Sequence, residues 1–194
     1  MRSVVYAVLA AGASQRMGFP KPVTPLAGAS PLARLARVLD GRRTIVVTAE
    51  ALAEACAQAI GRAEIAINPH PAAGMTSTLL VAHRIADPAA VLGVLLADKP
   101  FVRRETLERC ERALAENPEC DVLFPVNRAR PGHPVYLGPK ARARLGSLAP
   151  GDTLRELRDD PQLQRVEVES SDAGTVIDLD TRAAWEAAER RLHA

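Results

Sequence analysis

Two cations follow a short apolar run near the start of the chain. Val4–Leu9 is apolar, and Arg16 and Lys21 come soon after it among glycines and alanines. The run predicts a buried strand, and the small residues let the backbone turn sharply and approach a ligand. Backbone N–H groups and fixed positive charge at the carboxyl end of a strand bind phosphate groups. We therefore predict a polyphosphate site, with an ordinary solvated turn as the alternative.

Three carboxylates are placed to join this loop. Asp98 follows the apolar run Val91–Leu96, which predicts a central strand buried on both faces. Its carboxylate then reaches the same edge of the sheet as the loop, where Mg²⁺ bridging phosphates would sit. Asp178 and Asp180 alternate at the end of a later predicted strand and could supply a second carboxylate. We favour Asp178, because Asp180 stands where a helix N-cap is expected.

Apolar runs and helical patterns alternate along the whole chain. Strands that alternate with helices imply an α/β fold with a mostly parallel sheet and helices on both faces. At this length a single domain over residues 1–194 is expected. The predicted strands are Val4–Leu9, Thr44–Val47, Glu64–Ile67, Val91–Leu96, Asp121–Val126, Pro134–Leu137, Gln164–Val168 and Thr175–Leu179. The predicted helices are Leu32–Leu39, Ala49–Ile60, Met75–Ala86, Arg104–Glu116, Pro139–Leu145, Thr153–Arg158 and Thr181–Leu192.

Composition excludes several classes of protein. The net charge of +2 is too small to predict a nucleic-acid surface, and no apolar run reaches the ~18 residues of a membrane span. Cys56, Cys110 and Cys120 are odd in number and widely spaced, which argues against a disulfide framework or a zinc site. A secretory leader is disfavoured because the first apolar run is short and leads directly to the cations. We expect a cytoplasmic protein.

The first loop is not either of the common glycine-rich phosphate loops. Lys21 comes three residues after Gly18, so the Walker pattern fails, and the dinucleotide pattern G-x-G-x-x-G is absent. The loop instead resembles the signature AAGxSxRMGxxK of molybdenum cofactor cytidylyltransferases and related nucleotidyltransferases. Later motifs of that family follow in order over residues 4–185, including an Asp-x-Pro element with Lys99 in place of the usual Gln. The matching loop residues are Ala10, Ala11, Gly12, Ser14, Arg16, Met17, Gly18 and Lys21.

The resemblance implies roles for residues that the pattern alone leaves open. Leu9 and the loop residues Ala10, Ala11, Gly12, Ser14, Arg16 and Lys21 would bind the nucleotide, with Arg16, Lys21 and Asp98 catalytic. Gly74, Ser77 and Thr78, at a predicted helix start, would contact base or ribose, although a simple helix cap is the alternative. His133 and Asp152 would face the acceptor, although a structural histidine and another cap are the alternatives.

The fold implied by the resemblance is a Rossmann-like three-layer sandwich, and the implied reaction is Mg²⁺-dependent transfer of CMP. CTP would donate to a phosphate-bearing acceptor, molybdenum-molybdopterin, and a molybdoenzyme would receive the product. Ala11 fills the place where the guanylyltransferase branch carries glycine, and its methyl group would favour a pyrimidine. The alternatives are guanylyl transfer, a sugar phosphate or isoprenoid-precursor phosphate as acceptor, and a non-catalytic nucleotide-binding or cofactor-binding relative. A dinucleotide oxidoreductase is disfavoured by the missing glycine fingerprint.

Overall fold

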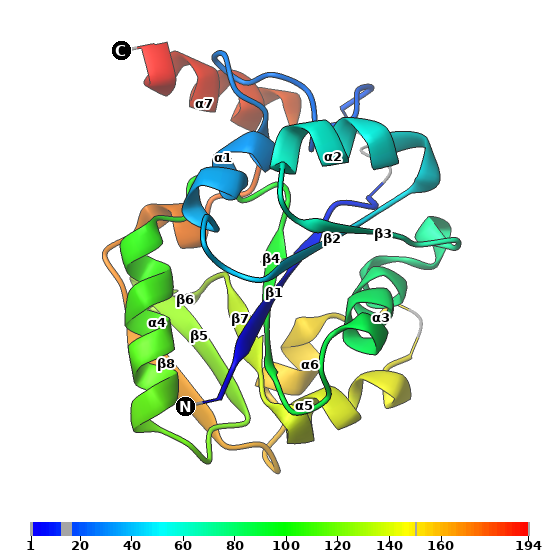
Figure 1. Cartoon of the computed structure of the whole chain (residues 1–194). Coiled ribbons are helices and arrows are strands. Elements are labelled where there is room, and N and C mark those ends of the chain that lie inside the picture. Colours follow the sequence, from blue (N-terminus) through cyan, green and yellow to red (C-terminus); the bar gives the residue numbers. More distant parts are fainter. Residues whose placement is uncertain (1, 13–16, 150, 194) are drawn as a thin grey trace.

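A mixed sheet forms the centre of the molecule. The computed structural model describes residues 2–12, 17–149 and 151–193, and within them eight strands form one sheet in the order β3-β2-β1-β4-β7-β5-β6, with β8 paired to β5 (Figure 1). The strands are β1 (Val4–Leu9), β2 (Thr44–Thr48), β3 (Glu64–Ile67), β4 (Val91–Leu96), β5 (Val122–Asn127), β6 (Arg130–Pro131), β7 (Val135–Leu137) and β8 (Arg165–Glu169).

The first half of the sheet is parallel. β1 pairs with β2 on one side and with β4 on the other, in a register that places Leu9 beside both Val47 and Leu96. β3 extends this parallel part beyond β2. The carboxyl ends of these strands therefore meet at one edge, where ligands bind in open α/β sheets. β7 runs antiparallel to β4 and β5, while β5 and β8 are parallel to each other, so the whole sheet is mixed.

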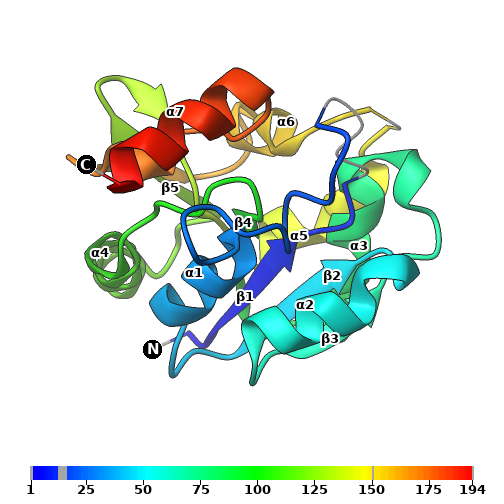
Figure 2. The same cartoon turned by 90° about the horizontal axis from the view of Figure 1, so that it is seen from above.

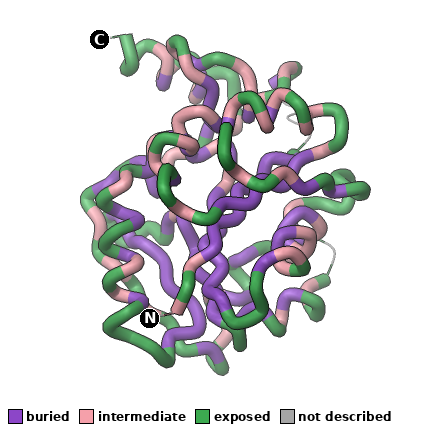
Figure 3. The backbone as a smooth tube through the Cα atoms, viewed as in Figure 1, coloured by how far each residue is buried: buried purple, intermediate pink, exposed green. Residues whose placement is uncertain are grey.

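Helices cover both faces of the sheet and make three layers (Figure 2). α1 (Pro31–Val38), α2 (Ala53–Ile60) and α4 (Arg104–Glu116) share one apolar core with the sheet. α3 (Met75–Ile85), α5 (Pro139–Ala143) and α6 (Leu154–Arg158) share a second core on the opposite face. The buried backbone runs through the strands between the two helical layers, as Figure 3 shows. The Rossmann-like three-layer prediction is confirmed.

The last helix, α7 (Arg182–His193), packs outside these two cores. Trp185 and Ala188 join Met17, Leu26 and Leu179 in a third, smaller cluster, and the Trp185 ring meets Phe19 edge to face. This cluster lies at the carboxyl edge of the sheet, where α7 is seen at the upper left of Figure 1. It attaches the end of the described chain to the segment that follows β1.

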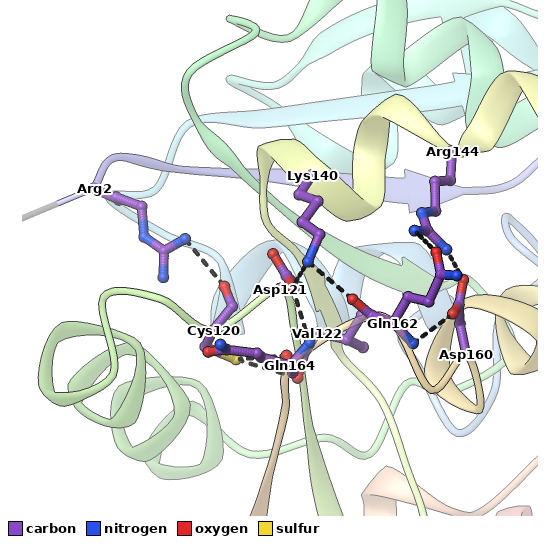
Figure 4. Close-up of polar contacts among 9 residues, drawn as sticks. All are labelled: Arg2, Cys120, Asp121, Val122, Lys140, Arg144, Asp160, Gln162 and Gln164. Carbon is purple, nitrogen blue, oxygen red and sulfur yellow. Dashed lines mark hydrogen bonds and ion pairs between the residues drawn. The ribbon is translucent and has the colours of Figure 1, made fainter.

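A buried carboxylate fixes the outer strand β8. Asp121 accepts hydrogen bonds from Lys140 Nζ at 3.2 Å and from the Gln164 backbone N–H at 2.9 Å, and Lys140 also donates to the Gln162 carbonyl (Figure 4). A nearby pair, Arg144 and Asp160, closes the turn before β8. Because hydrogen bonds to charged groups are stronger than neutral ones, these contacts hold β8 against β5 although its own side chains are largely exposed.

A buried arginine fixes α3. The guanidinium of Arg142 is almost fully buried and donates to the carbonyl oxygens of His83, Ala86 and Ala90. Carbonyls at the end of a helix and in the following turn have no intrahelical donors, and the partial negative charge of a helix C-terminus favours a cation there. Arg142 therefore anchors the far end of α3, whose first residues lie at the carboxyl edge of the sheet.

The structure corrects the sequence predictions at three places. The helix expected over Ala49–Ile60 starts as a 3₁₀ turn, η1 (Glu50–Leu52), before α2. The strand β6 was not predicted. The predicted strand Thr175–Leu179 is wrong, because residues 173–175 form a 3₁₀ turn, η4 (Ala173–Thr175), and residues 176–180 form no strand. Two further 3₁₀ turns are η2 (Pro71–Ala73) and η3 (Leu145–Ser147).

Close backbone packing explains why residues 172–175 leave the strand geometry. Gly174 lies so near Phe101 that a Cβ atom would come 2.0 Å from the Phe101 carbonyl oxygen. Asp172 is buried and accepts hydrogen bonds from the backbone N–H groups of Gly174 and Arg103 and from the Thr106 hydroxyl. These contacts bind the segment to the start of α4.

In the described part of the chain no helix is long and apolar enough to cross a membrane. The three cysteines are free and buried, in agreement with the prediction that they form no disulfide.

Candidate functional site

A cavity of about 590 Å³ opens at the carboxyl edge of the parallel strands. Its walls come from the loop after β1, the end of β4 with Asp98, the start of α3, and Asp180 from the segment before α7. The predicted residues that line it are Leu9, Ala10, Ala11, Gly12, Lys21, Gly74, Thr78, Asp98 and Asp180. Residues separated by most of the chain thus meet in one place.

The loop after β1 forms the floor of the cavity. Ala10 and Ala11 are buried, and the Ala10 backbone N–H donates to the Val47 carbonyl of β2 at 2.8 Å. Small side chains leave the backbone open to a ligand at this point. Ser14 and Arg16, which the sequence analysis assigned to the same loop, lie outside the described residues.

Lys21 brings a cation into the cavity. Its Nζ donates a hydrogen bond to Asp180 Oδ1 at 2.8 Å and lies 3.6 Å from Asp98 Oδ2. Only 13% of the Lys21 side chain is exposed. Hydrogen bonds from Val23 and Thr24 to the Pro20 carbonyl form the turn that presents it. One ammonium group therefore lies between two carboxylates, one from the middle of the chain and one from near its C-terminal end.

One oxygen of the Asp98 carboxylate has no hydrogen-bond partner among the described residues. Asp98 Oδ1 is buried and accepts no hydrogen bond from any described residue. Burial raises the pKa of Asp98, Lys21 lowers it, and the neighbouring Asp180 raises it further. A desolvated carboxylate beside a second carboxylate needs a cation for its charged form. In the described chain no three metal-binding side chains form a cluster, but two carboxylates together with substrate phosphates are a usual set of Mg²⁺ ligands. The residues fit such an ion.

Asp178 and Asp180 have different surroundings. Asp180 lines the cavity beside Lys21, whereas Asp178 forms an ion pair with the buried Lys99 and is 46% exposed. The expected alternation on one strand is therefore wrong, since the segment is not a strand. The Leu179 backbone N–H donates to the Asp98 carbonyl at 3.1 Å, so the whole segment is held against the end of β4.

The prediction that Asp180 caps the last helix is also wrong. Thr181 caps α7, because its hydroxyl accepts a hydrogen bond from the Ala184 backbone N–H at 3.1 Å. The Asp180 carboxylate instead accepts a hydrogen bond from Lys21 and lines the cavity. The physical reason for preferring Asp178 as the cavity carboxylate is therefore removed.

Replacing the observed cap should affect stability alone. We expect Thr181→Ala to lower the free energy of unfolding by about 1 kcal/mol, the usual cost of losing an N-cap side chain. Thr181→Ser keeps the hydroxyl and should unfold like the wild type. Urea unfolding followed by circular dichroism measures both variants. An alanine variant as stable as the serine variant would show that the cap contributes nothing.

The start of α3 forms the opposite wall. Gly74 has φ +91°, a conformation that favours glycine, and Thr78 lines the cavity nearby. Ser77 is not among the residues that line the cavity. Its hydroxyl donates a hydrogen bond to the Gly74 carbonyl at 2.7 Å. Asn68, which the sequence analysis missed, is buried and donates to Ser77 Oγ and Thr78 Oγ1. Its position directly after β3 was the available signal.

His133 and Asp152 are not among the residues that line the cavity. The His133 backbone N–H donates to the Thr175 carbonyl, and its buried Nε2 has no hydrogen-bond partner among the described residues. Burial lowers the pKa of His133 to about 3, so the ring is neutral at physiological pH. The Asp152 carboxylate accepts from the Ala149 backbone N–H, and its carbonyl accepts from the Thr76 hydroxyl at 2.7 Å. The turn that carries Asp152 therefore touches the start of α3.

A Rossmann-like sheet with a small-residue loop, a lysine and acidic residues at its carboxyl edge defines a nucleotide-binding α/β protein. The chain matches the family model of the MobA-like NTP transferase domain over residues 6–167. It therefore belongs to the MobA-like nucleotidyltransferase family, as the first loop suggested. No curated protein sequence matches the chain.

Solved structures share this fold over nearly their whole length. Rv0371C from Mycobacterium tuberculosis H37Rv, in complex with manganese, is 20% identical with a TM-score of 0.73, and the match covers 97% of this chain and 98% of that one. Molybdopterin-guanine dinucleotide biosynthesis protein A from Archaeoglobus fulgidus is 20% identical with a TM-score of 0.76 over 97% and 98%. A CMP:2-keto-3-deoxy-manno-octonic acid synthetase in complex with CTP is 14% identical with a TM-score of 0.74 over 98% of both chains.

Proposed function

We propose that this protein transfers CMP from CTP to a phosphate-bearing acceptor, molybdenum-molybdopterin, and releases pyrophosphate. The observation that carries the proposal is the cavity in which Lys21 lies between Asp98 and Asp180 at the end of β1 and β4. A triphosphate needs cations around its β- and γ-phosphates and a carboxylate-held metal near the reacting phosphate. The cavity offers both kinds of group on one edge of the sheet.

The chemistry requires alignment and charge neutralisation. A terminal phosphate oxygen of the acceptor attacks the α-phosphorus of CTP, the bond from that phosphorus to the oxygen bridging to the β-phosphate breaks, and pyrophosphate leaves. Groups that are already positioned and stabilise the developing charge lower the barrier without reorganising. Lys21 is such a group, since two carboxylates hold its ammonium in the cavity. Arg16, from the same loop in the sequence, is assigned the same role.

Mg²⁺ is the proposed cofactor, and it would neutralise charge on the phosphates when bound. Asp98 and Asp180 would hold it, because both line the cavity and Asp98 Oδ1 has no described partner. Asp178 is the weaker candidate, since it does not line the cavity and pairs with Lys99 outside it. The manganese complex of Rv0371C agrees with a divalent-metal site in this family.

The preference for CTP rests on Ala11. The residue is buried and lines the cavity, and its methyl group is proposed to take space that a larger purine would need. The start of α3, with Gly74 and Thr78, supplies the backbone and hydroxyl groups that would contact base or ribose. Ser77 would act only by holding the Gly74 carbonyl.

Removing the Ala11 methyl group should relax nucleotide choice. We expect Ala11→Gly to narrow the preference for CTP over GTP by about tenfold to a hundredfold, because one methyl group in a pocket contributes about 1–3 kcal/mol of discrimination. The measurement is kcat/KM for both nucleotides in the wild type and the variant. Ala66→Gly, at a buried alanine that does not line the cavity, is the matched control. Wild-type protein that uses GTP better than CTP would overturn the assignment to cytidylyl transfer.

The acceptor is proposed to bind beside the turn that carries Asp152. That turn contacts α3 through the bond from the Thr76 hydroxyl to the Asp152 carbonyl, and Thr76 lies next to the cavity residue Met75. His133 is proposed to face the acceptor as well; burial lowers its pKa, and the Lys99 charge lowers it further. A molybdoenzyme in the cytoplasm would then receive the product.

Pyrophosphate release with each nucleoside triphosphate tests the proposal. The acceptors are molybdenum-molybdopterin, a hexose 1-phosphate and methylerythritol phosphate. Release with CTP and molybdenum-molybdopterin alone is the expected result. Release with GTP, or with another acceptor, would support guanylyl transfer or a different branch of the family. Nucleotide binding without release would make the protein a non-catalytic relative.

A further inference from the structure

A second cavity, of about 520 Å³, lies at the opposite edge of the sheet. It is formed where β1 begins, by the residues after α1 and the outer turns of α4. β1 has six residues and rises about 3.3 Å per residue, so the two cavities are separated by roughly 20 Å along the strand. Neither the fold nor the proposed transfer reaction requires a cavity here.

Arginines dominate this second cavity. Arg2, Arg42, Arg43 and Arg104 line it, against the two carboxylates of Asp40 and Glu111. Glu111 is already engaged: it accepts two hydrogen bonds from Arg42, at 2.7 and 2.9 Å, and one from the Tyr6 hydroxyl at 2.6 Å. The charge of Glu111 is therefore neutralised by Arg42, and the remaining lining residues of the cavity carry more positive than negative charge.

The other three arginines are not paired with carboxylates in the described chain. Arg104 donates to the carbonyls of Arg37 and Asp40, and Arg2 donates to the carbonyls of Asn117 and Cys120, the latter bond being visible in Figure 4. Carbonyl oxygens orient a guanidinium but do not cancel its charge. The Arg2 Nε is buried and has no hydrogen-bond partner among the described residues.

Arg43 is the most available of the four. Its side chain is exposed and makes no hydrogen bond or ion pair with another described residue, while its backbone is fixed by the bond from the Tyr6 N–H to its carbonyl. Arginine presents five N–H donors in a planar fork that suits phosphate oxygens. Oriented guanidinium groups with free donors and uncompensated charge in one hollow form an anion-binding arrangement.

We propose that this cavity is a second binding site, for a small polyphosphate anion. Several phosphate groups match the spread of Arg2, Arg43 and Arg104 around one hollow, and a volume close to that of the first cavity accommodates such a molecule. The site is independent of the transfer reaction, because it shares no lining residue with the first cavity.

Inorganic pyrophosphate is the probe, titrated by isothermal calorimetry without divalent metal. An Arg16→Ala, Lys21→Ala double variant serves as the background, so that binding at the first cavity is suppressed. Arg43→Glu is the test variant, and Arg62→Glu, an exposed arginine outside both cavities, is the matched control with the same change of charge. Citrate is titrated in parallel to separate a polyphosphate site from a site for any polyanion.

We expect the background variant to keep pyrophosphate binding, Arg43→Glu to weaken it at least tenfold, and Arg62→Glu to change it little. Tighter binding of pyrophosphate than of citrate supports the assignment to phosphates. Loss of all binding in the background variant would overturn the proposal, as would equal effects of the two glutamate variants or equal affinity for citrate. Because Arg43 is exposed, melting temperatures of the variants should agree. Failure here would leave the transfer reaction at the first cavity untouched.

Discussion

Asp98→Asn should abolish nucleotidyl transfer while leaving the fold intact. The amide keeps the shape of the side chain but removes the charge that the proposed Mg²⁺ site needs. Burial raises the pKa of Asp98, and its Oδ1 has no partner among the described residues, so the charged carboxylate costs the folded protein more free energy than a neutral amide would. We therefore expect a melting temperature at pH 7 no lower than that of the wild type. Pyrophosphate release over a range of Mg²⁺ concentrations, together with thermal unfolding, measures both effects.

The two C-terminal carboxylates provide an internal comparison. Asp180→Asn should be nearly as severe as Asp98→Asn, because Asp180 lies beside Lys21 in the same cavity. Asp178→Asn should cost much less, since it breaks an ion pair with Lys99 that does not belong to the cavity wall. Full activity in Asp98→Asn would contradict the proposal that Asp98 and Asp180 hold Mg²⁺. A more severe loss in Asp178→Asn than in Asp180→Asn would restore the assignment made from the sequence.

Lys21→Ala should reduce turnover roughly 10²–10³-fold, the usual cost of losing one positioned electrostatic contact in a transition state. The Lys21 ammonium contributes because Asp98 and Asp180 hold it in place before the nucleotide binds. The loss should appear in kcat more than in KM, since charge builds on the phosphates as pyrophosphate departs. Single-turnover rates with saturating CTP measure the chemical step.

Lys21→Arg is the control for charge alone. It keeps the cation but replaces a compact ammonium with a planar guanidinium, which does not fit the same position. We expect an intermediate rate. A wild-type rate in Lys21→Ala would exclude the loop after β1 from the mechanism, whereas a wild-type rate in Lys21→Arg would show that charge suffices without placement.

Local patterns in the sequence were enough to predict the three layers of the fold and about half of the residues that line the cavity. The apolar runs of β1 and β4 predicted strands of one mostly parallel sheet, and their carboxyl ends do bring the first loop and Asp98 together. Ser30 before Pro31 predicted the start of α1, and its hydroxyl accepts from the Ala33 N–H. These features depend on residues close in the chain, which periodicity and capping rules describe well.

The strand predicted before α7 is wrong because contacts with residues distant in the sequence decide the conformation of this segment. Ile177 and Leu179 alternate with Asp178 and Asp180 as in a strand. Packing of Gly174 on Phe101 and the bond from Leu179 to the Asp98 carbonyl impose another path. An alternating pattern of apolar and acidic residues carries no information about such contacts. The sequence therefore favours Asp178 over Asp180 as the second metal ligand, whereas the structure places Asp180 in the cavity. The sequence does not predict the role of Asn68, because one amide directly after a strand is too weak a signal and its bonds to Ser77 and Thr78 depend on the fold.

The ion pair between Lys21 and Asp180 also has a consequence for biosynthesis of the protein. The two residues are 159 positions apart, so a ribosome synthesises the loop after β1 long before it synthesises Asp180. Domains generally fold as units, so the loop stays without its carboxylate partner until the last segment of the domain has been made. Residues 172–180 must then dock on the start of α4 and the end of β4. A growing chain therefore acquires a competent site only after this segment has been made, and chains that stop before Asp180 are expected to be inactive.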